Sequence, residues 1–86
     1  MSDADFMREA LNEAGLAAAA GEMPVGCVIA RGDKIVARAH NECEAAHDAT
    51  AHAELLAIRL ASATCGDWRR FIYWLAAATL TATVTF

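Results

Sequence analysis

Residues 24–39 read PVGCVIARGDKIVARA and define the centre of the fold. Two short, mainly apolar runs, residues 25–30 and 35–39, flank the polar segment Arg31-Gly32-Asp33-Lys34. Runs of this length on either side of a tight turn that contains glycine are typical of a β-hairpin. We therefore expect two antiparallel strands here, with the other elements packed around them.

An amphipathic helix is expected before the hairpin. Ser2 or Asp3 can cap this helix, and Gly21 is a suitable terminator. Apolar residues recur three and four positions apart between these limits, which is the spacing of one helical face. The residues concerned are Phe6, Met7, Ala10, Leu11, Ala14, Ala17 and Ala18.

A second helix and a third strand are expected after the hairpin. Residues 40–49 show no apolar period and predict a loop, Thr50 can cap the next helix, and Gly66 can end it. Residues 79–86 alternate threonine with apolar residues, as a strand with two different faces does. The order helix, strand, strand, helix, strand predicts an α/β fold with a small mixed sheet, in one domain that spans residues 1–86.

Composition argues against several classes of protein. Seven Lys and Arg against eleven Asp and Glu give a net charge of −4, which disfavours a broad basic surface for duplex nucleic acid; Arg69-Arg70 is the one adjacent basic pair. The three cysteines are odd in number and form no close pair, and no signal peptide precedes them, so we expect a cytoplasmic protein without a disulfide framework. The uncharged residues 71–86 are too few for the roughly 18 to 20 of a membrane-spanning helix, and no membrane association is expected.

The tripeptide His52-Ala53-Glu54 carries the most chemical information. If Thr50 is the cap, both polar side chains lie in the first helical turn and can lean toward a metal ion and its bound water. Zinc lowers the pKa of a bound water toward ~7, and a carboxylate that is not a ligand can carry the proton to a leaving amine. His52 is then a candidate zinc ligand and Glu54 a candidate proton shuttle. The alternative without chemistry is a solvated pair of first-turn side chains.

Four segments place this tripeptide in a wider pattern: residues 23–26 (MPVG), 40–41 (HN), 48–54 (DATAHAE) and 66–69 (GDWR). In this order they closely resemble the N-terminal half of the bacterial tRNA adenosine deaminases, within the cytidine deaminase-like superfamily. The similarity covers residues 4–70, roughly. It implies a truncated cytidine deaminase-like fold and a zinc-dependent hydrolysis that converts adenosine to inosine in the single-stranded anticodon loop of a tRNA.

The resemblance also implies roles for individual residues. His52 matches the family's histidine zinc ligand, which makes Zn²⁺ the expected cofactor, and Glu54 matches its general acid and base. Asn41 matches the asparagine that hydrogen-bonds the base. Val25 and Ala53 match residues that line the base pocket.

Two departures from the family pattern bear on activity. Ala49 stands where the family usually has proline, which restores backbone freedom to the loop. The Glu-Pro-Cys-x-x-Cys segment that follows the third strand in the family is absent from the sequence. Because a catalytic zinc normally keeps three protein ligands, His52 needs two more. The remaining candidates, none with paired spacing, are Cys27, Cys43, Cys65, His40 and His47.

Three interpretations of the function follow, and whether the chain is an enzyme stays open among them. The first is a zinc-dependent tRNA adenosine deaminase. The second is a catalytically incomplete, metal-free deaminase-like domain that serves as a folding or self-association module. The third is a zinc site completed in trans by a second chain that carries the cysteines. An uncovered sheet edge or the apolar C-terminal segment invites pairing with another chain, so we expect a homo-oligomer.

Overall fold

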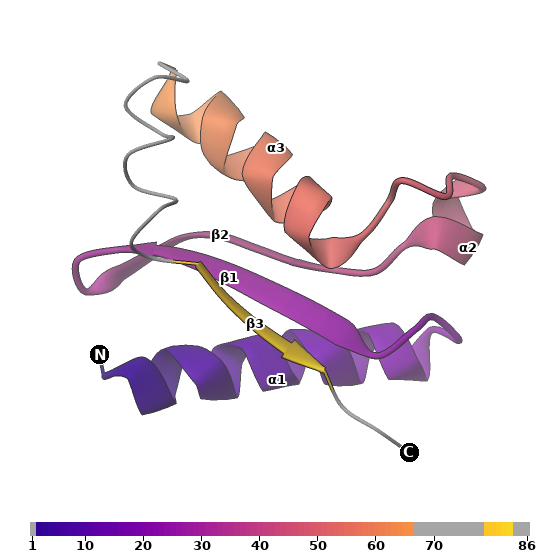
Figure 1. The fold of residues 1–86 in the computed structure, drawn as a ribbon, viewed down its shortest axis with the longest axis horizontal. Coiled ribbons are helices and arrows are strands. Elements are labelled where there is room, and N and C mark those ends of the chain that lie inside the picture. Colours follow the sequence, from indigo (N-terminus) through magenta and orange to yellow (C-terminus); the bar gives the residue numbers. More distant parts are fainter. Residues whose placement is uncertain (1, 67–78, 84–86) are drawn as a thin grey trace.

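The computed structural model describes residues 2–66 and 79–83. Helix α1 (Asp3–Ala19) precedes a hairpin of strands β1 (Val25–Arg31) and β2 (Lys34–His40). The short helix α2 (Cys43–Ala46), helix α3 (Ala53–Cys65) and strand β3 (Thr79–Thr83) follow (Figure 1). This order confirms the predicted α/β fold and adds one short helix. Arg69-Arg70, residues 71–78 and the end of the predicted third strand, residues 84–86, lie outside the described residues.

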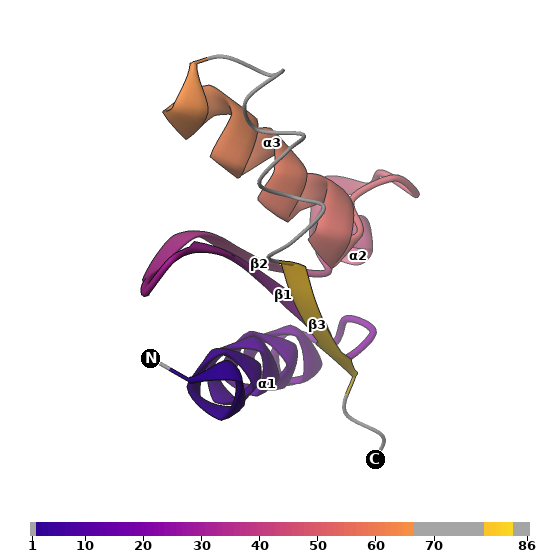
Figure 2. The same cartoon turned by 60° about the vertical axis from the view of Figure 1, so that its left-hand side comes forward.

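The sheet lies between α1 on one face and α3 on the other (Figures 1 and 2). Its strand order is β2-β1-β3, so β1 is central. Val28 and Ala30 of β1 pack with Phe6 and Ala10 of α1. Cys27 and Ile29 of β1 belong to the core cluster on the other face of the sheet. This cluster also contains Ala53, Ala57 and Ala61 of α3. Because successive strand residues point to opposite faces, a strand covered on both sides has few polar residues, and residues 25–30 of β1 have none.

The described strands pair only antiparallel, so the mixed sheet that we predicted is not found among them. Val28 of β1 is opposite Arg38 of β2 on one side and Leu80 of β3 on the other. Strands β2 and β3 therefore run in the same direction, but β1 separates them. A parallel pair of neighbours would require β3 to lie at the outer edge of β2, and the chain instead crosses from β2 through α3 to the far side of β1.

The hairpin is formed as predicted. Gly32 and Asp33 make a two-residue turn between the paired residues Arg31 and Lys34. Gly32 has a φ of +60°, which a glycine at the first turn position adopts without strain, as in a type II′ turn. The register shifts between Ile29 and Ala30, so the ladder contains a β-bulge.

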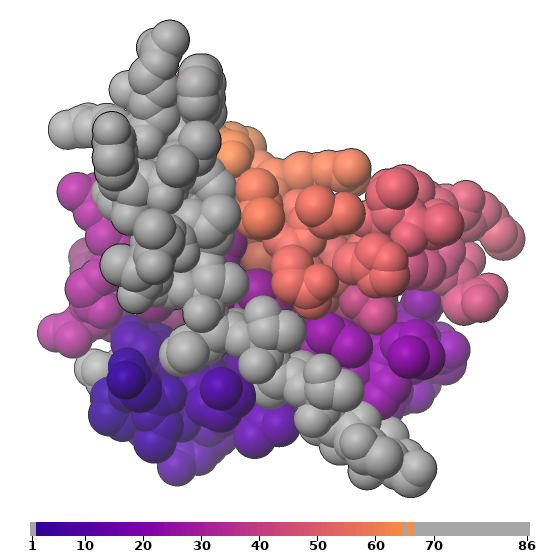
Figure 3. Space-filling model, viewed as in Figure 1, coloured from indigo at the N-terminus to yellow at the C-terminus, as the bar shows by residue number. Residues whose placement is uncertain are grey.

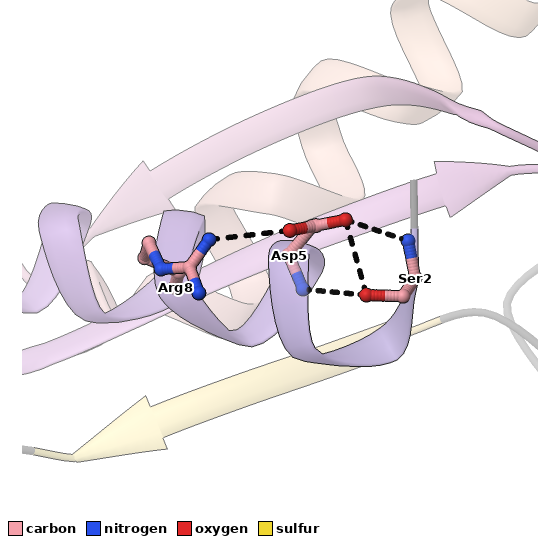
Figure 4. Close-up of polar contacts among 3 residues, drawn as sticks. All are labelled: Ser2, Asp5 and Arg8. Carbon is pink, nitrogen blue, oxygen red and sulfur yellow. Dashed lines mark hydrogen bonds and ion pairs between the residues drawn. The ribbon is translucent and has the colours of Figure 1, made fainter.

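Helix α1 begins and ends where the sequence predicts. The Asp5 N–H donates to Ser2 Oγ at 3.2 Å, and the Ser2 N–H donates to the Asp5 carboxylate at 2.9 Å, which is a capping box (Figure 4). Arg8 adds a 3.2 Å ion pair to the same carboxylate. Gly21 follows the helix with a φ of +78°.

The predicted N-cap of the second long helix is wrong. His52 and not Thr50 occupies the cap position of α3, and the His52 side chain makes no capping hydrogen bond. Thr50 is already engaged, because its hydroxyl and its N–H donate to Asp48 Oδ1 at 2.7 and 2.8 Å. This turn delays the start of the helix by two residues. The predicted end is confirmed, since Gly66 is the C-cap with a φ of +75°.

Helix α2 lies inside the stretch that we predicted to be a loop. None of its residues is buried, so it has no apolar face for the sequence to reveal. In the space-filling view α2 and α3 lie next to each other on one side of the molecule (Figure 3). Within residues 2–66 and 79–83, no helix has both the length and the hydropathy for a membrane crossing.

Candidate active site

The predicted site residues meet where α3 begins. The Asn41 N–H donates to the Val25 carbonyl oxygen at 3.1 Å, and Asn41 Oδ1 accepts from the Ala53 N–H at 2.8 Å. Strand β1 starts and β2 ends at the same end of the sheet, because the two strands are antiparallel. Two hydrogen bonds thus join the first residue of β1, the residue after β2 and the first residue of α3.

Asn41 is buried, with 4% of its surface exposed. The Ala53 N–H needs an acceptor, so the side-chain oxygen must be the atom that faces it, and the Nδ2 donors point elsewhere. No fully buried side-chain nitrogen or oxygen among the described residues lacks a partner. Within residues 2–66 and 79–83 Nδ2 has no hydrogen-bond acceptor, which makes it a candidate donor to a ligand.

His52 and Glu54 flank the residue that Asn41 holds. His52 has extended backbone torsions, φ −79° and ψ 149°, and an exposed side chain, whereas Glu54 is half-buried in the first turn of α3. Residues two apart point to opposite faces of a regular helix. Because His52 precedes the first helical turn and has an extended backbone, its side chain need not point away from that of Glu54. The N-terminal end of α3 also presents backbone N–H groups, which favour an anion such as hydroxide.

A depression of about 290 Å³ lies beside Asn41. Asn41 and Pro24 are among its lining residues, and neither Val25 nor Ala53 is. The Ala53 side chain is fully buried in the core cluster that α3 forms with β1 and β2. Val25 is partly buried and packs against the same cluster. Ala53 thus contacts the site through its backbone N–H.

The described residues do not form a zinc site by themselves. No three of their His, Cys, Asp and Glu side chains gather closely enough to hold a metal ion. Cys27 is buried in the core, the Cys43 thiol donates to the Ala49 carbonyl oxygen at 3.8 Å, and His40 Nδ1 lies 2.7 Å from Glu13 Oε2. Within residues 2–66 and 79–83, His52 therefore lacks the two further ligands that a catalytic zinc normally has.

Sequence reasoning missed Glu22. Its carboxylate is buried, with 8% of the residue exposed, and accepts the N–H groups of Glu44 and Ala45 at 2.9 Å each. The signal in the sequence is an acidic residue that directly precedes the MPVG segment, at a position expected to be in a turn.

Comparison with known proteins identifies the family. Residues 1–84 match the family described as the cytidine and deoxycytidylate deaminase zinc-binding region. The chain belongs to this family. The match confirms the predicted resemblance, and it extends beyond residue 70 to the region of β3.

Relatives within this deaminase family include proteins that act on tRNA. The tRNA-specific adenosine deaminase of Streptococcus pyogenes is 45% identical over 64 residues, which cover 74% of this chain and 40% of that protein. The chloroplastic tRNA(adenine(34)) deaminase of Arabidopsis thaliana is 49% identical over 67 residues, covering 78% of this chain and 5% of that protein. The chain spans about two fifths of the length of the bacterial relatives.

Two solved structures have similar folds. One comes from a study of A-to-I editing by tRNA deaminases at the wobble position, with a TM-score of 0.72 and 38% identity over 74% of this chain and 49% of that chain. The other is the guanine deaminase of Bacillus subtilis, with a TM-score of 0.74 and 35% identity over 79% of this chain and 44% of that chain. Because the two similarities are nearly equal, the fold establishes a deaminase domain but does not select the base.

Proposed function

We propose that this chain supplies the base-binding and proton-transfer part of a zinc-dependent deaminase that converts adenosine to inosine in a tRNA anticodon loop. The hydrogen bond from the Ala53 N–H to Asn41 Oδ1 carries the proposal. It fixes the asparagine side chain at Ala53, the residue between His52 and Glu54, and uses only the oxygen of the amide. Relatives named as tRNA-specific adenosine deaminases support adenosine and tRNA as the substrate class.

The reaction replaces an amino group with an oxygen. The oxygen of a water forms a bond to carbon 6 of adenine, the bond from this carbon to the amino nitrogen breaks, and ammonia leaves. Glu54 takes the proton from the water and passes it to the leaving amine. The Nδ2 group of Asn41 donates to a ring nitrogen and so orients the base. The base must leave its stack to reach these groups, which favours a single-stranded loop.

Zinc is the cofactor that the family description names. We assign His52 as one ligand. Residues 67–78 and 84–86 contain no histidine or cysteine, so the other ligands must come from sequence outside residues 1–86 or from a second chain. The alternative function is that of a chain which binds no zinc. In that case the domain is a metal-free folding or self-association module.

A homo-oligomer and a cytoplasmic location belong to the same proposal. Among the described strands, β3 has a neighbour on one side only. Strand β2, at the other edge, carries exposed Lys34 and Arg38, and charged residues on an edge discourage pairing. Self-association through β3 or the apolar residues 71–86 is therefore favoured. The odd number of cysteines and their wide spacing in the sequence support a reducing compartment.

The test combines metal analysis with an activity assay. Stoichiometric zinc in the wild-type protein that is lost in His52→Ala would support the assigned ligand. Glu54→Gln should keep the zinc but lower inosine formation on an anticodon stem-loop roughly 100-fold or more, since it cannot exchange protons. Glu42→Gln removes an exposed carboxylate nearby and is the matched control. A wild-type chain with neither zinc nor inosine formation would contradict deamination by this chain and leave the metal-free module.

A further inference from the structure

Glu22 is a buried acid whose two carboxylate oxygens both bind backbone. It lies between α1 and β1, and Oε1 accepts the Glu44 N–H while Oε2 accepts the Ala45 N–H, each at 2.9 Å. These donors belong to the second and third residues of α2. The first N–H groups of a helix have no partner within it, and a carboxylate is their most favourable acceptor.

Helix α2 has little else to hold it in place. Its N-cap residue, Glu42, makes no side-chain capping hydrogen bond, and none of the four helical residues is buried. Apolar packing therefore contributes little to its position. A helix of this length is also unstable by itself, because the cost of nucleation is not recovered in a single turn. The long-range contact with Glu22 replaces the missing local cap.

Asn41 lies between β2 and α2, so the position of α2 bears directly on it. On the strand side its N–H is bound to Val25, and the next residue, Glu42, donates its N–H to the Ala51 carbonyl oxygen at 3.0 Å. Glu22 and Asn41 also line the same depression of about 290 Å³. If α2 moved, the backbone that aims the Asn41 side chain at Ala53 would move with it.

We propose that Glu22 is a positioning residue, which fixes Asn41 through α2 and so sets the geometry of the base-binding side chain. Its importance for the reaction rests on the function proposed above. Within the described residues the Glu22 carboxylate hydrogen-bonds to the backbone of Glu44 and Ala45, and we assign it no proton transfer.

Amide hydrogen exchange of the full chain, followed by NMR, tests the proposal. In Glu22→Ala we expect exchange at Glu44, Ala45 and Ala53 to become about tenfold faster, as the loss of a charge-assisted hydrogen bond predicts. Glu22→Gln keeps one acceptor oxygen and should restore part of the protection at Ala53. Glu44→Gln is the matched control, because it removes one negative charge from α2 and keeps the backbone N–H groups that Glu22 binds. It should leave the exchange rate of the Ala53 amide unchanged.

Ala53 is the decisive amide because its acceptor is Asn41, whereas Glu44 and Ala45 report the cap alone. Faster exchange at Glu44 and Ala45 with unchanged exchange at Ala53 overturns the positioning role. The amide of Ile29 in β1 measures global unfolding, and equal acceleration at Ile29 and Ala53 in both Glu22 variants also overturns it.

The exchange measurement needs neither RNA nor metal, so it is separate from the proposed function. If the wild-type chain forms no inosine, the deaminase proposal fails while Ala53 exchange still decides the role of Glu22. If inosine forms, Glu22→Gln should raise KM more than it lowers kcat, because a misplaced Asn41 weakens the hold on the base. A fall in kcat with unchanged KM would overturn the assignment.

Discussion

Asn41 uses the two ends of its side-chain amide for different purposes. The oxygen accepts the first N–H of α3 at 2.8 Å, and we propose that the nitrogen donates to the base. In this proposal a structural role and a binding role coincide in one side chain. Substitutions that separate the two ends can tell which role a loss of activity reflects.

Asn41→Asp keeps the acceptor and removes the donors. A carboxylate at the start of a helix is favourable, so we expect the free energy of unfolding to be retained and binding of an anticodon stem-loop to be lost. Asn41→Ala removes both ends and should also lower the free energy of unfolding by about 1 kcal/mol. Urea denaturation and fluorescence anisotropy measure the two effects. Undiminished binding by Asn41→Asp would contradict contact between Nδ2 and the base.

At Gly26, strand β1 lies very close to the backbone of α1. A Cβ at this position would collide with the Ala10 carbonyl oxygen and the Ala14 nitrogen, which are backbone atoms that cannot move aside separately. We expect Gly26→Ala to lower the free energy of unfolding by about 1–3 kcal/mol.

Gly15 is the matched control for this substitution. It lies inside α1, and a Cβ there would meet no atom within 4 Å. Gly15→Ala should raise the free energy of unfolding by about 0.5–1 kcal/mol, since alanine favours the helix. Equal effects of the two substitutions in denaturant titrations would argue against a tight contact at Gly26.

At the scale of elements, the ends of the helices show where local sequence is informative. Ser2, Gly21 and Gly66 were predicted correctly because each acts on its own helix end. Thr50 was not, because Asp48 competes for its hydroxyl. Helix α2 was missed since it buries nothing.

The candidate site shows the same limit over longer distances. Asn41, His52 and Glu54 were found through the motifs that carry the family resemblance. Glu22 was missed because its partners are backbone amides of residues 44 and 45, and a backbone donor leaves no mark in the sequence. The sheet also departed from expectation, since the side of β1 on which β3 pairs is decided by the packing of whole layers and not by its own residues.

The capping box predicts a response of α1 to acid. The backbone hydrogen bond from Ser2, then its side-chain hydrogen bond and Arg8, hold the pKa of Asp5 below its ordinary value of 3.8. A depressed folded pKa stabilises the folded state above the unfolded pKa, and this stabilisation is lost as the pH falls through the folded pKa. We therefore expect fraying at the start of α1 below about pH 4.

NMR signals of residues 3–6, recorded during acidification, measure this fraying. Asp5→Asn and Ser2→Ala should each remove the pH dependence at the start of α1. Asp48, whose pKa is lowered chiefly by the hydroxyl of Thr50, should keep its own acid transition in both variants. An unchanged transition at residues 3–6 in Asp5→Asn would assign the effect to another group.

At the scale of the whole molecule, the sheet has two unlike edges. One is β2, with its charged residues, and the other is β3, whose sequence TLTAT carries no charge. We expect the purified chain to associate at micromolar concentration, because an uncharged edge strand offers unpaired backbone groups to another chain. Light scattering over a dilution series measures the mass, and a monomer at all concentrations would contradict the expectation.

The turn at Gly32 and Asp33 lies at the end of the hairpin opposite to Val25 and Asn41, since β1 runs the length of the sheet between them. Both turn residues are exposed. Loop tips of this kind accept inserted peptides. A fluorophore, an affinity tag or a surface tether attached here would therefore face away from the candidate site. This turn is thus a suitable attachment site for labels.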